Sequence, residues 1–79
     1  MEARWPVEAL LEAINGISAD STEFDLWVPD QLTLRGSEVG QDIAMAIILD
    51  KLLGKGLMPA GFTQGASGRT YHYHRDNSN

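Results

Sequence analysis

The sequence predicts a small α+β domain in which two helices pack on one face of a mainly antiparallel sheet of three or four strands. Two segments repeat their apolar residues at helical spacing, and the segments between and after them alternate apolar with polar residues. A short glycine-containing loop divides the last third of the chain into a hairpin. The expected order is α-β-(β)-α-β-β, where the bracket marks an optional strand. The apolar faces of the helices and the apolar face of the sheet would bury each other.

The length of 79 residues suits one domain, which we expect to span residues 1–75. Residues 76–79, DNSN, are expected to form a frayed polar tail. Hydrophobic residues make up 43% of the chain and charged residues 22%, which is typical of a globular protein.

The first helix is predicted from a stripe at i, i+3, i+4 and i+7, formed by Val7, Leu10, Leu11 and Ile14. Pro6 suits its first turn, and Asn15-Gly16 is expected to end it with a left-handed residue. FDLWV, residues 24–28, alternates as a strand does. LTLR, residues 32–35, is either a second short strand or a turn of helix or irregular chain.

The second helix is expected over residues 37–55, with Ser37 as its N-cap and Gly56 as its C-cap. On a helical wheel it is apolar most of the way round, whereas a surface helix needs one apolar stripe. Ala44 and Ile48 fall on the wheel's polar side. Either the helix is central, between the sheet and the first helix, or its surplus face meets another copy of the chain in a homodimer.

Asp50 lies within one apolar arc of this helix, and its neighbours at i−4 and i+4, Ala46 and Gly54, offer no cation. We expect either a partner from elsewhere, such as an arginine or a histidine, or a carboxylate that is simply hydrated at the rim.

The last third predicts a hairpin in which strands 57–64 and 69–75 flank a four-residue loop. Its register would place Gln64 opposite Arg69, Phe62 opposite Tyr71 and Ala60 opposite Tyr73 on one face. Thr63 would then face Thr70, Gly61 would face His72 and Pro59 would face His74 on the other. The aromatic face is the natural core face. The candidate binding residues are therefore His72 and His74 on the open face, framed by Arg69 and Arg75.

No catalytic motif is present, and the absence of cysteine removes thiol catalysis and zinc-thiolate sites. A histidine paired with Asp25 or Asp50 is conceivable as an acid–base pair. Two histidines at i, i+2 are too few for a metal site, and Asp76 is the nearest further ligand. We expect no enzyme activity, no cofactor and no metal.

The net charge of −5 is unevenly spread, with ten acidic and two basic residues in 1–50 and one acidic and four basic residues in 51–79. An acidic chain argues against general binding of nucleic acid. The acidic start MEARWPVEALLE is unlike a signal peptide, and no apolar run is long enough for a membrane span. The expected location is the cytoplasm.

The stretch LLGKGLMPAGFTQGASGRTYHYHR resembles the end of a winged-helix domain, with a helix, a glycine stop and a hairpin wing that carries arginines. This resemblance implies nucleic-acid binding by the basic 57–75 hairpin. The remaining chain departs from the family. The recognition helix would be apolar and carry Asp42 and Asp50, and the middle helix would have to come from PDQLTLRG, residues 29–36.

The favoured function is a non-catalytic protein-interaction or accessory domain. The partner is unidentified. Its surface would be the open sheet face, the apolar helix 37–55, or a C-terminal edge strand that pairs with a partner or with its own copy.

Overall fold

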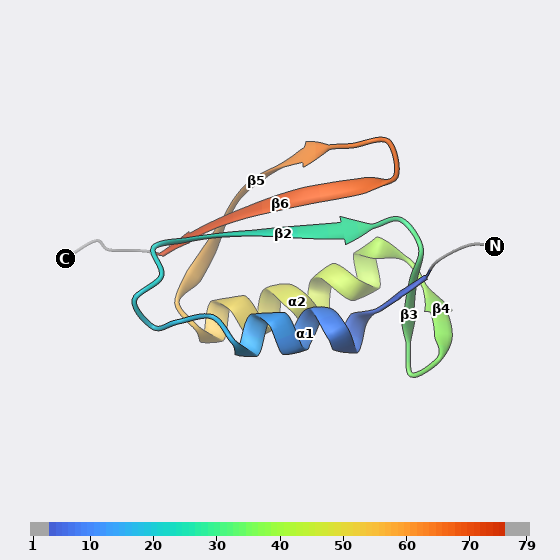
Figure 1. The fold of residues 1–79 in the computed structure, drawn as a ribbon, viewed down its shortest axis with the longest axis horizontal. Coiled ribbons are helices and arrows are strands. Elements are labelled where there is room, and N and C mark those ends of the chain that lie inside the picture. The colour runs from blue at the N-terminus through green and yellow to red at the C-terminus, as the bar shows by residue number, and fades with distance from the viewer. Residues whose placement is uncertain (1–3, 76–79) are drawn as a thin grey trace.

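An antiparallel sheet and a pair of helices form two layers, and a small mixed sheet lies at one end of them (Figure 1). The computed structural model describes residues 4–75, so the predicted tail 76–79 lies outside the described residues. In chain order the elements are β1 (Trp5–Pro6), α1 (Val7–Asn15), β2 (Glu23–Pro29), β3 (Leu32–Leu34), β4 (Ser37–Val39), α2 (Gln41–Gly54), β5 (Leu57–Gln64) and β6 (Gly68–Arg75). The α+β class and the C-terminal hairpin are confirmed, but the prediction of a single sheet is wrong.

The six strands within residues 4–75 divide into two sheets of three. One has the order β2-β6-β5 and is antiparallel throughout, and the other has the order β1-β3-β4 with β1 parallel to β3. The expectation of a C-terminal edge strand is therefore wrong. β6 is the central strand, because β2 pairs with one of its sides over all seven residues and β5 pairs with the other.

The second sheet depends on a tight turn at Arg35-Gly36. These residues have φ values of 54° and 82°, as a two-residue type I′ hairpin loop requires. The turn brings Ser37 back opposite Leu34, so LTLR does contain a strand. Ser37 was expected to cap the second helix and instead lies in β4, and α2 begins only at Gln41. PDQLTLRG thus forms β3 and its turn, and the described chain has no middle helix of the winged-helix kind.

The two helices end differently. Gly16 follows α1 with a φ of −83°, so the predicted left-handed residue is wrong there. The Gly16 N–H bonds to the carbonyls of Glu12 and Ala13, which continues the right-handed turn. The C-cap of α2 is Lys55, one residue before the predicted Gly56, and Gly56 follows it in the left-handed region with a φ of 81°. None of the described helices is long and apolar enough to cross a membrane.

The core is built from both helices and from strands of both sheets, and α2 contributes Ala44, Ile48 and Leu52. The helical wheel had placed Ala44 and Ile48 on the polar side. Gln41 and Lys55 stand at the two ends of this same face, and each donates hydrogen bonds to main-chain carbonyls of other segments. Polar residues can thus border the buried face because their hydrogen bonds are made within the protein.

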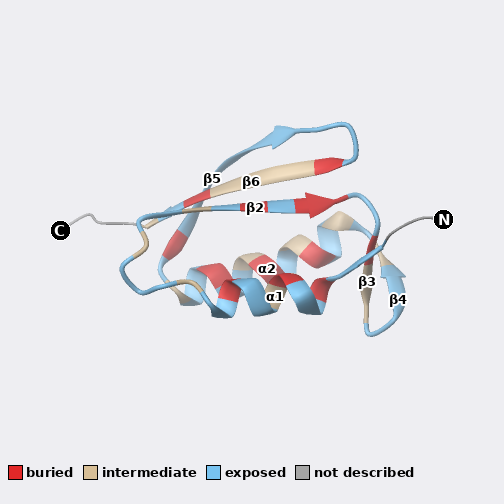
Figure 2. Cartoon of the chain, viewed as in Figure 1, coloured by how far each residue is buried: buried red, intermediate tan, exposed pale blue. Residues whose placement is uncertain are grey.

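The hairpin keeps its predicted register only near the loop. Gln64 pairs with Arg69, Thr63 with Thr70 and Phe62 with Tyr71. A bulge between Pro59 and Phe62, where Gly61 has a φ of 107°, then shifts the strand. Tyr73 consequently faces Pro59 and His74 faces Met58, so the predicted pairs of Tyr73 with Ala60 and of His74 with Pro59 are wrong, and Gly61 lies in the bulge instead of in a regular pair with His72. Figure 2 shows that β5 is exposed along nearly all its length.

Candidate functional site

Three polar side chains form a hydrogen-bonded row across the outward face of the antiparallel sheet. Asp25 on β2 stands directly opposite His72 on β6, and Thr63 lies on β5 beyond it. His72 Nδ1 is 2.9 Å from Asp25 Oδ1, and His72 Nε2 is 2.9 Å from Thr63 Oγ1. The structure thus joins His72 to Asp25, one of the two aspartates considered as its partner.

The hydrogen bonds of the row determine which of its atoms carry protons. An ionised Asp25 can only accept, so His72 Nδ1 carries a proton and donates to it. In the neutral ring Nε2 then accepts from the Thr63 hydroxyl. The order of acid, imidazole and hydroxyl is that of a hydrolytic triad. Thr63, however, is exposed on an edge strand, and such a nucleophile needs a closed site with donors for an oxyanion. The row orients His72 without giving Thr63 a reaction site.

His74 shares the outward face with His72 and stands opposite Glu23. The face therefore carries two acid–histidine pairs of neighbouring strands, although only the Asp25–His72 pair is hydrogen-bonded. Within residues 4–75 no group of three or more histidines and carboxylates could hold a metal ion. Asp76, the further ligand considered from the sequence, lies outside the described residues.

Arg69 belongs to a different cluster on the inward side of the sheet. Its guanidinium lies 4.6 Å from the centre of the Phe62 ring, its Nε donates to Gln64, and its Nη1 donates to the Tyr71 hydroxyl. That hydroxyl donates in turn to Gln41 Oε1. Arg69 thus ties the hairpin together and connects it through Tyr71 to the start of α2.

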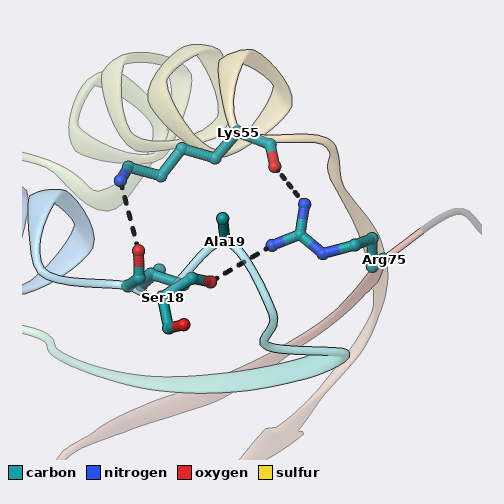
Figure 3. A pocket seen from close by; sticks show the side chains of 5 residues that line it. Ser18, Ala19, Lys55 and Arg75 are labelled. Carbon is teal, nitrogen blue, oxygen red and sulfur yellow. Dashed lines mark hydrogen bonds between the residues drawn. The ribbon is translucent and has the colours of Figure 1, made fainter.

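Arg75 lies at the other end of β6 and lines an open hollow of about 160 Å³ together with Ile17, Ser18, Ala19 and Lys55 (Figure 3). Its Nε donates to the Ser21 carbonyl at 2.6 Å, and its Nη1 donates to the Lys55 carbonyl. Lys55 Nζ donates to the carbonyl of Asn15 at 3.2 Å. The two cations therefore fasten the loop after α1 to the end of α2.

The hollow is a poor anion site despite its two cations. Lys55 and Arg75 have no carboxylate partner among the described residues, but main-chain carbonyls already accept from both. The carboxyl ends of α1 and α2 also meet here, and the helix dipole makes such an end negative. The cations neutralise these ends, which is a structural role.

The four predicted binding residues do not form one site. Side chains alternate along a strand, so Arg69 and Arg75 lie on the opposite face from His72 and His74. The two arginines are also six residues apart, or about 20 Å along an extended chain. Asp50 is exposed on α2, and its carboxylate has neither a hydrogen-bond nor an ion-pair partner within residues 4–75.

Sequence analysis missed Thr63, Gln41 and Lys55. Thr63 is brought beside His72 by the hairpin register near the loop, which the sequence did predict. Gln41 and Lys55 find their partners in segments 12 and 40 residues away, and no local pattern reports such contacts.

Two groups have perturbed acidities. Burial raises the pKa of Tyr73 to about 12, and the neighbouring Tyr71 adds to this. The pKa of Glu8 is lowered by hydrogen bonds from main-chain N–H groups, its own and that of Arg35, and by the charge of Arg35. The Arg35 N–H lies 2.7 Å from Glu8 Oε2. Both groups support the fold, and neither lies in the row of Asp25, His72 and Thr63.

Comparison of the chain with protein-family models, with curated proteins and with solved structures found no match.

Proposed function

We propose that this chain is a non-catalytic protein-interaction domain whose docking surface is the outer face of α2 and whose partner there is a second copy of the chain. The main support for this proposal is the exposure of large apolar side chains on one side of this helix. Ile43 is 53% exposed and Leu53 is 45% exposed, and Ala46 lies exposed between them. Large apolar side chains gathered on one helix face, here around the exposed Asp50, are typical of interaction sites.

The charges on this face favour an antiparallel pair of helices. In a parallel pair Asp50 would lie beside the partner's Asp50, and like charges repel. In an antiparallel pair whose midpoint lies at the level of position 48 along the helix axis, Asp50 faces the small side chain of the partner's Ala46. Ile43 then faces the partner's Leu53. The opposed helix dipoles also favour this arrangement.

The association is expected to be weak. α2 has 14 residues and is therefore about 21 Å long, so one helix face covers much less than the roughly 800 Å² per partner of a stable interface. Dimers should accumulate only at about 0.1–1 mM.

Sedimentation velocity between about 10 µM and 1 mM tests the proposal. The molar mass should rise with concentration, and Ile43→Asp or Leu53→Asp should keep the chain monomeric. Ala13→Asp, at an exposed position of α1, is the matched control and should leave the dimer intact. Tryptophan fluorescence verifies that each variant is folded. A wild-type chain that stays monomeric at about 1 mM would refute self-association.

Disulfide trapping tests the orientation, because the chain has no cysteine of its own. A mixture of Ile43→Cys and Leu53→Cys chains should form a mixed disulfide dimer, since the antiparallel pair brings these positions together. Each variant alone should cross-link poorly, because positions 43 and 53 are about 15 Å apart along a helix. Efficient cross-linking of Leu53→Cys with itself would show a parallel pair instead.

A further inference from the structure

We infer that the open edge of β2 is a second binding site, independent of α2, which takes up an extended basic segment of a partner as an additional strand. β2 is an edge strand, and within residues 4–75 no strand pairs with its other side. An edge of this kind presents main-chain donors and acceptors to a further chain.

The hydrogen bonds at the ends of β2 show which of its residues face the open edge. The Arg75 N–H donates to the Thr22 carbonyl at 2.8 Å, and the Asp30 N–H donates to the Ser67 carbonyl at 3.0 Å. Bonded and non-bonded positions alternate along an antiparallel pair. The even-numbered residues of β2 therefore bond to β6, and Glu23, Asp25 and Trp27 direct their main-chain groups outward.

The two edges of this sheet differ, because the proline and the bulge of β5 interrupt the middle of that strand, whereas the one proline of β2 is its last residue, Pro29. β5 carries Pro59, which lacks an N–H, and the bulge at Gly61, and both features hinder the addition of a strand. β2 keeps an unbroken register with β6 from Glu23 to Pro29. At its far end the outward-facing carbonyl of Pro29 is occupied, because Gln41 Nε2 donates to it at 3.1 Å.

The side chains along the edge determine the partner's chemistry. Glu23 and Asp25 project from the outward face, and the Glu23 carboxylate has no partner within residues 4–75. Opposite charges on adjacent strands attract and like charges repel. A basic strand is therefore favoured, and a second β2 in any register that overlaps these acids with themselves is disfavoured.

The next outward position is apolar. Trp27 is 44% exposed and packs edge-on against Trp5, with 6.3 Å between the ring centres. The structure thus fits a segment with basic side chains at two alternating positions, followed two residues later by an apolar side chain near Trp27. The residue between the two basic positions would lie beside the half-buried Phe24 on the inward face.

The probe is a capped seven-residue peptide with lysine at two alternating positions and valine at the other five, and its control is the same peptide with glutamate in place of the two lysines. Hydrogen exchange measured by NMR separates strand addition from simple attraction of charges. Amides of Phe24, Leu26 and Val28 should be protected without peptide. Those of Glu23, Asp25 and Trp27 should become protected only with the lysine peptide.

Variants complete the test. The double variant Glu23→Lys/Asp25→Lys should weaken binding of the lysine peptide by roughly tenfold and favour the glutamate peptide. Glu12→Lys, an exposed acid on α1, is the matched control and should bind normally. Ile43→Asp should also bind normally, so a failure at α2 does not affect this result. Unchanged exchange at positions 23, 25 and 27 in the presence of bound peptide would overturn the inference.

Discussion

Exchanging isoleucine for valine at two positions of α2 tests which side of this helix is buried. Ile48 is fully buried in the core, and Ile43 on the other side is about half exposed. Deleting one methylene from a buried isoleucine costs about 0.5–1.5 kcal/mol, because the cavity collapses only partly. The same deletion at Ile43 should alter the free energy of unfolding by less than about 0.5 kcal/mol. Both variants keep a β-branched residue, so their helix propensities remain similar.

Urea unfolding followed by tryptophan fluorescence provides the measurement. A chain of this size has a stability of about 4–12 kcal/mol and a urea slope near 1 kcal/mol/M. Ile48→Val should therefore lower the midpoint by about 0.5–1.5 M, and Ile43→Val should barely move it. Measurement near 5 µM keeps the chain monomeric under the proposed weak association. Equal shifts, or a larger shift for Ile43→Val, would show that α2 packs through the other face and would refute the assignment.

The remaining predictions test two glycines, Gly36 and Gly54, the titration of Tyr73 and Glu8, and the contacts of Arg75 at the helix ends. Gly36→Ala should cost about 1–2 kcal/mol in urea unfolding because of its positive φ, whereas Gly54→Ala, at the last residue of α2, should stabilise the chain by less than about 1 kcal/mol. Because the pKa of Tyr73 is raised, the folded state holds that proton more tightly, so thermal stability should fall from pH 10 to about 12, and Tyr73→Phe should remove this fall. Because the pKa of Glu8 is lowered, its contribution should be present above its unfolded pKa and be lost as the pH falls through the folded value; Glu8→Gln should flatten the acid limb of the melting curve. Arg75→Lys should lower the free energy of unfolding by roughly 1–3 kcal/mol, since one ammonium cannot replace a guanidinium that reaches the carbonyls of two segments. An unchanged urea midpoint would contradict the role of Arg75 in joining these segments.

The candidate site was predicted only in part. The alternation in GRTYHYHR correctly separated Tyr73, which is buried, from His72 and His74 on the outward face. The same alternation should have excluded Arg69 and Arg75 from that face, since they share the parity of the tyrosines. Asp25 and Thr63 could not be assigned to His72 with certainty, because strand order brings them together from positions 47 and 9 residues away.

The sequence by itself determined the local elements of this protein. The spacing of Val7, Leu10 and Ile14 was sufficient for α1, because a period of 3.6 residues makes one apolar face. The alternation in residues 24–28 was likewise sufficient for most of β2. Only the tertiary structure decided the division into two sheets, the central place of β6 and the buried side of α2. α2 is apolar most of the way round, so its orientation depended on distant carbonyls that accept from Gln41 and Lys55. Those contacts form between segments far apart in the chain, and a local pattern contains no information about them.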